Sequence, residues 1–285
     1  MVKCPALVFG AALLAGVAQV EASVKAEAVE YAHGGTILEG YLAYEETVQG
    51  PRPGVLVVHE WKGLGDYTKR RARQLAELGY VALAVDMYGK GVYAKDHEEA
   101  GKLSGALRGE RELMRGRILS ALDVLKHHPR VDAGRLGAIG YCFGGMAVLE
   151  LARSGADVAG VASFHGGLST PVPAKPGVVK AKVLVCRGSA DPFVTPEEVV
   201  AFEKEMRDAG VDSRLITYEG AVHSFTVPEA GDDPSKGVAY DPEADRRSWE
   251  ALQEFFQALF AQPAIAAIPP VKEGSACPVC AAKHQ

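Results

Sequence analysis

The sequence has no excess of positive charge: its 285 residues include 31 lysines and arginines against 36 acidic residues, which gives a net charge of −5. Because no basic run stands out, nucleic acid is not an expected partner. After residue 22 there is also no apolar stretch of the roughly 20 residues that a membrane-spanning helix needs. We therefore expect a monomer that acts on small organic molecules, with no nucleic-acid partner and no stable membrane anchor.

Cysteine is scarce, with five residues in the whole chain. Cys186 lies in a strand-like apolar run and is expected to serve as a small buried side chain. Cys277 and Cys280 form one isolated Cys-Pro-Val-Cys pair near the C-terminus, and a single pair is a weak signal. In an oxidising compartment the pair could form a disulfide, stay redox-active or bind a metal together with His284.

The first 22 residues have the pattern of a secretory signal peptide. Lys3 supplies the positive charge, residues 6–20 form an apolar core, and residues 20–22 provide a small-x-Ala cleavage site. The apolar core is short for a membrane span, so an uncleaved anchor is the weaker alternative. We expect cleavage before Ser23 and a secreted or periplasmic protein.

Short apolar runs alternate with helical patterns along the rest of the chain, which predicts a doubly wound, mostly parallel sheet of the α/β class. Loose alternation on either side of His33 predicts an antiparallel hairpin at the N-terminal edge of this sheet. We expect one domain over residues 23–262 and a poorly ordered, Ala- and Pro-rich tail over residues 263–285. Strands are expected at residues 24–31, 36–45, 55–58, 80–85, 136–139, 158–164, 182–187 and 214–218. Helices are expected at residues 66–78, 94–125 with a break around 105–109, 146–152, 196–209 and 241–260.

The run Gly140-Tyr-Cys-Phe-Gly-Gly145 follows one of these strands and opens a helix. Small residues at positions 140, 144 and 145 allow a sharp strand-to-helix turn that a Cβ would crowd. Such a turn presents the side chain of Cys142 and leaves free N–H groups at a helix start. The run therefore predicts a nucleophile elbow with cysteine in place of serine; the alternative is a glycine-rich turn around a structural cysteine.

Four polar residues directly follow predicted strands: Glu60, Cys142, Asp191 and His223. Active sites of open α/β sheets form at the carboxyl ends of the strands, so one cleft could collect all four. The order nucleophile, acid, histidine is that of the α/β-hydrolase fold. Cys142 would then be the nucleophile, His223 its base, and Asp191 the group that orients the imidazole. The alternative for Asp191 is a structural Asp-Pro turn.

Other histidines compete for the role of base. His165 also follows a strand, but we prefer His223 because it follows the last strand and precedes the final helix. His59 would point away from Glu60 if the strand continues, so we expect it to pack or to form hydrogen bonds. The remaining candidates are expected at the surface: His33, His97, His127 and His128.

Taken together, the elbow at 140–145, Gly-Ser-Ala-Asp-Pro at 188–192, His-Ser-Phe at 223–225 and the Glu60 loop resemble the dienelactone hydrolase family, from about residue 23 to residue 260. The resemblance implies an α/β-hydrolase fold, a Cys-His-Asp triad and neither a metal nor an organic cofactor.

The same resemblance implies roles for three further residues. Glu60 would interact with the resting thiol, and substrate binding would switch Cys142 to a thiolate. The backbone N–H groups of Trp61 and Phe143 would form the oxyanion hole. The alternative for Glu60 is a surface acid in a loop.

Two substrate-binding positions depart from the family pattern. Family members that open dienelactones carry arginines for the substrate carboxylate, and the first of these matches Lys90, a point charge without the arginine fork. The second falls near Val227, which has no charge. Tyr88 and Lys90 are the expected substrate contacts. A signal peptide is a third departure, since dienelactone breakdown usually belongs to cytoplasmic catabolism.

The sequence thus predicts a secreted hydrolase that cleaves an ester or lactone through an acyl-enzyme on Cys142. Within enzymes, the alternative is a general carboxylesterase. From a different class, the alternative is a redox or binding protein that uses Cys142 and the terminal cysteine pair.

Overall fold

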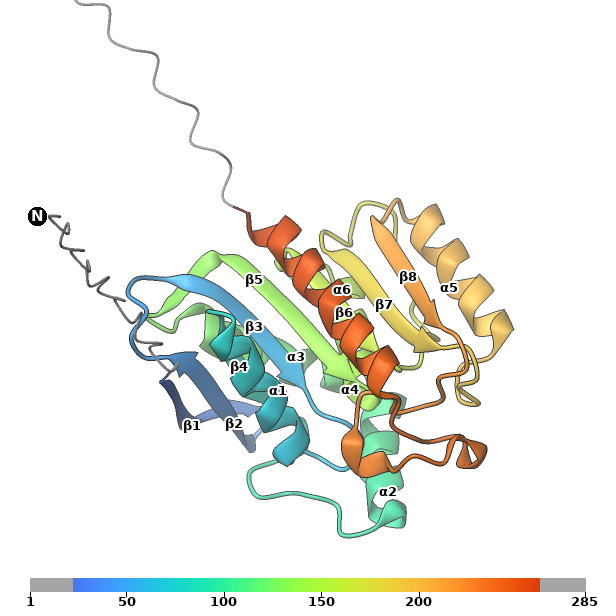
Figure 1. The fold of residues 1–285 in the computed structure, drawn as a ribbon. Coiled ribbons are helices and arrows are strands. Elements are labelled where there is room, and N and C mark those ends of the chain that lie inside the picture. The colour runs from blue at the N-terminus through green and yellow to red at the C-terminus, as the bar shows by residue number, and fades with distance from the viewer. Residues whose placement is uncertain (1–22, 262–285) are drawn as a thin grey trace, which may run out of the picture.

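The computed structural model describes residues 23–261. The expected signal peptide and the C-terminal pair Cys277 and Cys280 therefore lie outside the described residues. Within the described part, the chain forms a mixed sheet of eight strands with helices on both faces (Figure 1). None of the helices between residues 23 and 261 is long and apolar enough to cross a membrane.

The strands lie in the order β1-β2-β4-β3-β5-β6-β7-β8. Their bounds are β1 (Val24–His33), β2 (Thr36–Glu45), β3 (Arg52–Val58), β4 (Val81–Val85), β5 (Val131–Tyr141), β6 (Gly160–Phe164), β7 (Lys182–Gly188) and β8 (Ser213–Tyr218). β1 pairs antiparallel with β2 and β2 antiparallel with β4, while all later pairings are parallel. The predicted antiparallel edge hairpin and the mostly parallel sheet are therefore confirmed.

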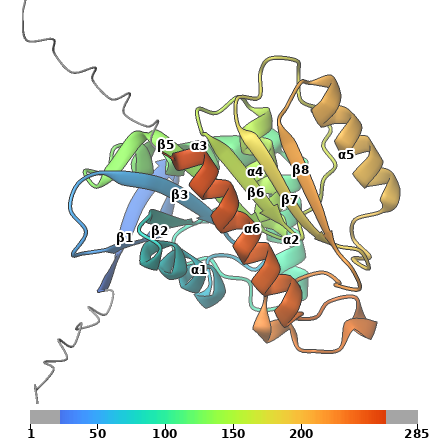
Figure 2. The same cartoon turned by 45° about the horizontal axis from the view of Figure 1, so that its top comes forward.

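Helices cover the sheet in two layers. Their bounds are α1 (Asp66–Glu77), α2 (His97–Gly109), α3 (Arg111–Lys126), α4 (Phe143–Arg153), α5 (Pro196–Asp208) and α6 (Pro242–Phe260). Two views agree that α1 and α6 lie on one face (Figures 1 and 2). The helices α3, α4 and α5 contribute to the apolar core on the opposite face.

The central strands are buried on both sides, which explains their continuous apolar sequences. Along β3, Val55 and Val57 enter the core beneath α1 and α6, whereas Leu56 and Val58 enter the core beneath α3 and α4. Because successive side chains of a strand point to opposite faces, both sets must be apolar. This burial fixes the strand so that the residues after Val58 emerge at the carboxyl edge of the sheet.

Several boundaries differ from the sequence expectation, among them those of α1, of the break between α2 and α3, and of β5. Asp66 is the first residue of α1, Gly65 is its N-cap, and the helix ends at Glu77, one residue before the expected end. The break between α2 and α3 is at Glu110, just after the expected range. β5 begins at Val131, five residues before the expected start at 136. The added residues carry charges at Asp132 and Arg135 and lie next to a register shift, so no apolar run marks them.

Candidate active site

Cys142 lies at the sharp turn between the end of β5 and the start of α4. Its backbone has φ 53° and ψ −112°, a conformation that costs about 1–3 kcal/mol for a non-glycine residue. The neighbouring glycines make this turn possible. A Cβ on Gly140 would lie 2.0 Å from the oxygen of Gly144, and a Cβ on Gly144 would lie 2.2 Å from the oxygen of Val58. The backbone thus has the strained geometry of a nucleophile elbow.

His223 and Asp191 meet at the same edge of the sheet. The Nδ1 atom of His223 lies 2.9 Å from Oδ2 of Asp191, and both side chains are nearly excluded from solvent. The second oxygen of Asp191 accepts the backbone N–H of Phe193 at 2.9 Å. Because Asp191 is held from both sides, it can orient the imidazole with Nδ1 protonated and leave Nε2 for the reacting group.

The electrostatics of His223 favour its charged form. Burial lowers its pKa, but the hydrogen bond to Asp191 and the interaction with Cys142 outweigh burial and raise the pKa of His223 to about 10. An imidazolium beside the thiol stabilises a thiolate, which is the nucleophilic form of cysteine. The arrangement therefore suits a thiolate–imidazolium pair.

Glu60 follows β3 and reaches the loop that carries His223. The hydroxyl of Ser224 donates a hydrogen bond to Oε1 of Glu60 at 3.2 Å. Burial raises the pKa of Glu60, while the charge of His223 and the hydrogen bond from Ser224 oppose the increase. The contact that the structure places on Glu60 is thus to Ser224 rather than to the thiol of Cys142.

Two backbone N–H groups lie where the elbow and the Glu60 loop meet. Within residues 23–261, neither the N–H of Trp61 nor that of Phe143 donates to an acceptor. Phe143 is the first residue of α4, so its N–H also lies at the positive end of a helix. The hydroxyl of Tyr88 donates to the oxygen of Trp61 at 2.8 Å, and the ring of Tyr88 lies 5.6 Å from that of Phe143. Free donors of this kind can bind an oxyanion.

His59 forms buried hydrogen bonds, as expected. Its Nε2 accepts the backbone N–H of Met87 at 3.2 Å, so Nδ1 carries the proton and donates to the oxygen of Glu60. Burial lowers the pKa of His59 to about 4, despite the hydrogen bond to Glu60 and the charge of Asp86, which raise it. A neutral His59 thus fixes the backbone on which Glu60 stands.

His165, the rival base, is fully buried behind His223. Its Nε2 lies 2.8 Å from Oγ1 of Thr226, and its ring meets that of His223 edge-on at 5.2 Å. Burial, together with the charge of His223, lowers its pKa well below the usual range. His165 therefore supports the segment that carries His223, and no carboxylate among residues 23–261 pairs with it as Asp191 pairs with His223.

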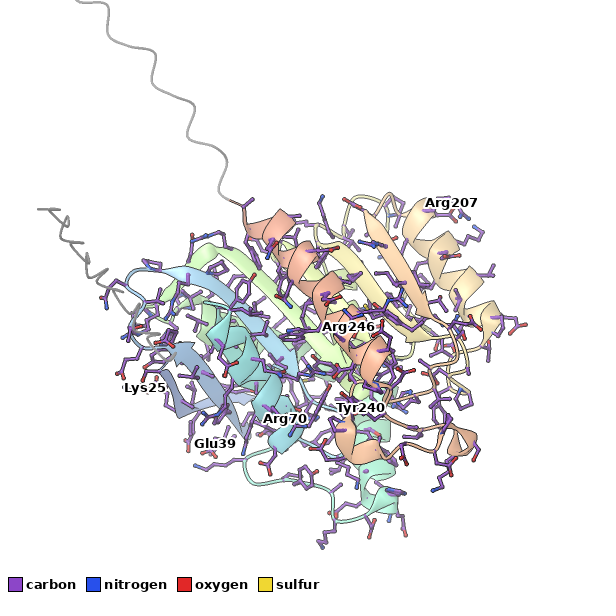
Figure 3. The ribbon with its side chains drawn as sticks, viewed as in Figure 1. Lys25, Glu39, Arg70, Arg207, Tyr240 and Arg246 are labelled. Atoms are coloured by element: carbon purple, nitrogen blue, oxygen red, sulfur yellow. The ribbon has the colours of Figure 1, made fainter. Side chains whose placement is uncertain are left out.

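The structure pairs Lys90, an expected substrate contact, with two acidic side chains of the N-terminal hairpin. Its ammonium pairs with Glu30 on β1 and, at 2.8 Å, with Glu39 on β2, whose position Figure 3 marks. Val227 is buried, and its N–H donates to the oxygen of Ser224. The two positions that hold arginines in the family pattern thus offer no free cation.

Two residues escaped the sequence reasoning. Ser224 has φ 57° and connects Glu60 to the segment that carries His223. The His-Ser-Phe motif contains Ser224, but the motif alone does not indicate this contact. Phe193 is 61% exposed and lies edge-on to His223, with 5.0 Å between ring centroids. An exposed aromatic side chain has no sequence signal, because only the fold places it beside His223. Among the described residues, no group of three or more His, Cys, Asp or Glu side chains could hold a metal ion.

Comparison with known proteins agrees with this geometry. The profile of the dienelactone hydrolase family matches residues 38–260. A solved structure named m3DLH is 42% identical, has a TM-score of 0.80, and is matched over 83% of this chain and 99% of its own. A dienelactone hydrolase-like promiscuous phosphotriesterase, P91, from metagenomic libraries is also 42% identical, with a TM-score of 0.79 and coverage of 83% and 98%.

A curated relative gives the same result. A putative carboxymethylenebutenolidase of Aquifex aeolicus (strain VF5) is 29% identical over 80% of this chain and 96% of its own length. The strand order and the likeness to m3DLH confirm the expected α/β-hydrolase fold. The chain therefore belongs to the dienelactone hydrolase family and is a hydrolase of the carboxylic-ester class.

Proposed function

We propose that the protein cleaves an ester or lactone by nucleophilic catalysis, with Cys142 as nucleophile, His223 as acid and base, and Asp191 as the group that orients His223. The observation that carries the proposal is the strained elbow at Cys142 beside a histidine whose Nδ1 lies 2.9 Å from Asp191. These are the parts that acyl transfer to a thiol requires.

In the first half of the reaction, the thiolate of Cys142 attacks the carbonyl carbon and a C–S bond forms. The carbonyl π electrons move to oxygen, where the N–H groups of Trp61 and Phe143 stabilise the charge. As the C=O bond re-forms, the C–O bond to the leaving group breaks. The leaving oxygen takes the proton from Nε2 of His223, which leaves a thioester on Cys142.

In the second half, neutral His223 takes a proton from water, and the resulting hydroxide attacks the thioester carbonyl. The C–S bond then breaks, the carboxylic acid departs, and Cys142 leaves as the thiolate beside protonated His223. Glu60 lies on the same loop as Trp61, so its hydrogen bond with Ser224 aligns one oxyanion donor with the segment that carries His223.

The direct test is to trap the acyl-enzyme. Intact mass spectrometry of the protein quenched during turnover of 4-nitrophenyl butyrate should show one added butyryl group, and peptide mapping should place it on Cys142. Cys142→Ala should remove both the adduct and the activity. Cys186→Ala is the matched control and should keep both, because burial raises the pKa of the Cys186 thiol to about 12. An adduct that persists in Cys142→Ala would refute the assignment.

A phosphotriesterase activity is a second candidate, favoured by the 42% identity to the promiscuous phosphotriesterase P91. Attack of the same thiolate on phosphorus would form a phosphorylated Cys142 and release an alcohol. Turnover of paraoxon that is lost in both Cys142→Ala and His223→Ala would support it. A redox or binding role would instead leave ester hydrolysis absent in the wild type and thiol reactivity intact.

We further propose that the mature enzyme is a monomer and is secreted or periplasmic. The proposal rests on the charged start and apolar core of residues 1–22. Expression of the full chain in a Gram-negative host should yield a periplasmic protein that begins at Ser23. N-terminal sequencing of a cytoplasmic product that begins at Met1 would overturn it, and light scattering would test the monomer.

A further inference from the structure

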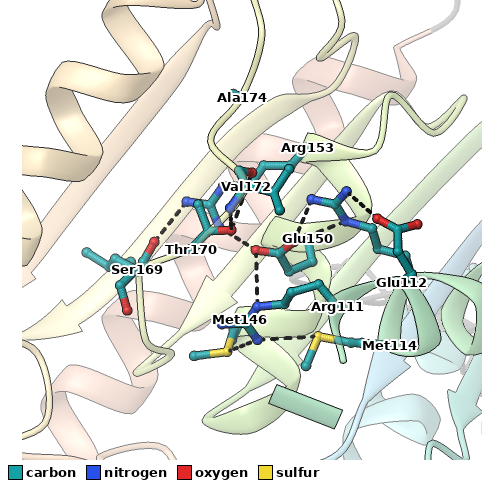
Figure 4. A network of polar contacts seen from close by, with 12 residues as sticks. Arg111, Glu112, Met114, Met146, Glu150, Arg153, Ser169, Thr170, Val172 and Ala174 are labelled. Carbon is teal, nitrogen blue, oxygen red and sulfur yellow. Dashed lines mark hydrogen bonds and ion pairs between the residues drawn. The ribbon is translucent and has the colours of Figure 1, made fainter. Parts of the chain in front are cut away.

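A buried cluster of charges lies behind the elbow, on the face of α4 that carries Cys142. At its centre is Glu150, whose side chain has no solvent exposure, with Arg111, Arg115 and Arg153 around it. Figure 4 labels Glu150, Arg111 and Arg153 in this cluster. Cys142, Met146 and Glu150 follow one another at four-residue intervals, so they share one face of the helix. The cluster is therefore connected to the nucleophile along a single helical stripe.

Arg115 and Arg153 together form hydrogen bonds to both carboxylate oxygens of Glu150. Arg115 donates from Nε and Nη2 to Oε2 of Glu150, at 3.1 and 2.7 Å. Arg153 donates to Oε1 of Glu150 at 3.2 Å and makes a two-pronged pair with Glu205, at 2.9 and 2.8 Å. Each of these guanidinium groups therefore has a close carboxylate partner.

Arg111, the third arginine, forms no hydrogen bond to a carboxylate of the described residues. Its side chain is only 10% exposed, yet its nearest carboxylate oxygen, on Glu150, is 3.9 Å away. Its Nε is buried with no hydrogen-bond partner, and its Nη1 contacts the thioether sulfur of Met146 at 2.9 Å. A thioether is a weak acceptor, whereas a guanidinium prefers carboxylate or phosphate. The three arginines thus share the two carboxylates of Glu150 and Glu205, and Arg111 has only a long contact of 3.9 Å to one of them.

The position of Arg111 relates it to the reaction centre. Met146 lies one helical turn from Cys142, which corresponds to about 6 Å along the helix axis. Both residues belong to one apolar cluster that also contains Tyr88, and Met146 is a flexible side chain that can give way to a ligand. An anion that displaced the Met146 sulfur from Arg111 would therefore lie close to Cys142.

A second cation stands on the outer side of this position. Arg108 is exposed at the end of α2, and within the described residues it forms no ion pair. Burial raises the pKa of Tyr88, and the charge of Arg108 opposes the increase, so the field of Arg108 reaches the site. Lys90, in contrast, is neutralised by Glu30 and Glu39.

We propose that Arg111, assisted by Arg108 at the rim, binds an anionic group of the substrate on the Met146 side of Cys142. The inference rests on the proposed function. It assigns the specificity to esters that carry a carboxylate on the Met146 side of the attacked carbonyl. Arg111 is then a specificity-determining residue at a position distinct from Lys90 and Val227.

The kinetic test compares two esters with the same leaving group: 4-nitrophenyl butyrate, which is neutral, and mono-4-nitrophenyl glutarate, which is anionic. Arg111→Gln should lower kcat/KM for the glutarate ester by about 10- to 100-fold, mainly through KM, because a charge-assisted contact is lost. The butyrate ester should change by less than about threefold. Arg111→Lys should keep part of the preference, since it retains the charge without the fork.

The matched control is Arg207→Gln on α5, an exposed arginine whose position Figure 3 marks. This variant should leave kcat/KM unchanged for both esters. If Arg111→Gln lowers kcat/KM equally for both esters, Arg111 has a structural role only and the proposal is wrong. A wild type that hydrolyses both esters without favouring the glutarate ester would also overturn it.

A binding measurement separates this inference from the proposed function. In Cys142→Ala protein, calorimetry should detect monomethyl glutarate more strongly than dimethyl glutarate, and the added Arg111→Gln change should remove the difference. If the anionic ester binds but the wild type hydrolyses neither 4-nitrophenyl ester, the proposed function fails and the anion site stands. Equal binding of the two methyl esters would overturn the anion site, whatever the activity.

Discussion

Ser224, the residue after His223, donates a hydrogen bond at 3.2 Å to Glu60, which follows β3. Two loops that are far apart in the sequence are thus joined beside His223. Ser224 has φ 57°, a left-handed conformation that costs a non-glycine residue about 1 kcal/mol or more. A strained residue that makes one specific contact is expected to matter for activity.

Ser224→Ala should lower kcat/KM for 4-nitrophenyl butyrate by about 2- to 10-fold, because a hydrogen bond contributes about 0.5–1.5 kcal/mol. Ser224→Gly removes the same hydroxyl but relieves the strain. It should therefore lose similar activity and melt at a higher temperature than Ser224→Ala. Steady-state kinetics and thermal unfolding of the two variants check this, and unchanged kinetics in both would show that Glu60 needs no support from Ser224.

The raised pKa of His223 predicts the pH dependence of activity. A pKa of about 10, above the ordinary value of ~6.5, means that the folded protein keeps the proton on His223 through neutral pH. The proton needed by the leaving group is then lost only as the pH rises through about 10. We expect kcat/KM to stay level between about pH 7 and 9 and to fall above it.

Asp191→Asn tests whether Asp191 sets the pKa that governs the fall of kcat/KM at high pH. The substitution removes the charge that raises the pKa of His223, so the high-pH limb should move to lower pH. A profile that instead rises through pH ~6.5 in the wild type would indicate a neutral histidine acting as base in the resting enzyme, against the thiolate–imidazolium pair.

Phe193 should contribute to the binding of aromatic esters. It is 61% exposed and lies 5.0 Å from the His223 ring, and its contact with Asp191 uses only its backbone N–H. Phe193→Ala should raise KM for phenyl acetate about 3- to 10-fold, since an aromatic contact contributes about 0.5–1.5 kcal/mol. KM for ethyl acetate should change little. Val200→Ala, at a 66% exposed position on α5, is the control and should affect neither ester.

Much of this arrangement follows from the sequence because strand ends and glycine turns leave local signals. Cys142, Asp191 and His223 each follow a predicted strand, and a parallel sheet brings such residues to one edge. Arg111 and Phe193 could not be found this way. The Glu150 cluster joins α3, α4 and α5, so the surplus charge on Arg111 exists only after three helices pack together.

At Lys90, the contacts in the structure differ from what the family pattern implies. Its position in the sequence matches a substrate-binding arginine of the family pattern, but the β1–β2 hairpin places Glu30 and Glu39 beside it. Pairing across strands depends on register, which a local pattern does not specify. The sequence pattern therefore predicts that Cys142, Asp191 and His223 follow strand ends, but it does not predict which acids pair with Lys90.

The Glu150 cluster should also be the most sensitive polar site for stability. Glu150→Gln removes the carboxylate that faces three arginines with side chains no more than 10% exposed, and it leaves their charges uncompensated in the interior. Breaking a buried pair in this way costs about 3–5 kcal/mol. Urea denaturation should show a loss of this size in the free energy of unfolding.

Glu112→Gln is the matched control, because Glu112 also pairs with Arg115 but has an 86% exposed side chain. It should change stability far less, since exposed pairs contribute little. Equal losses in the two variants would mean that the cluster is hydrated, and Arg111 would then lack the buried surplus charge that draws an anion toward Cys142.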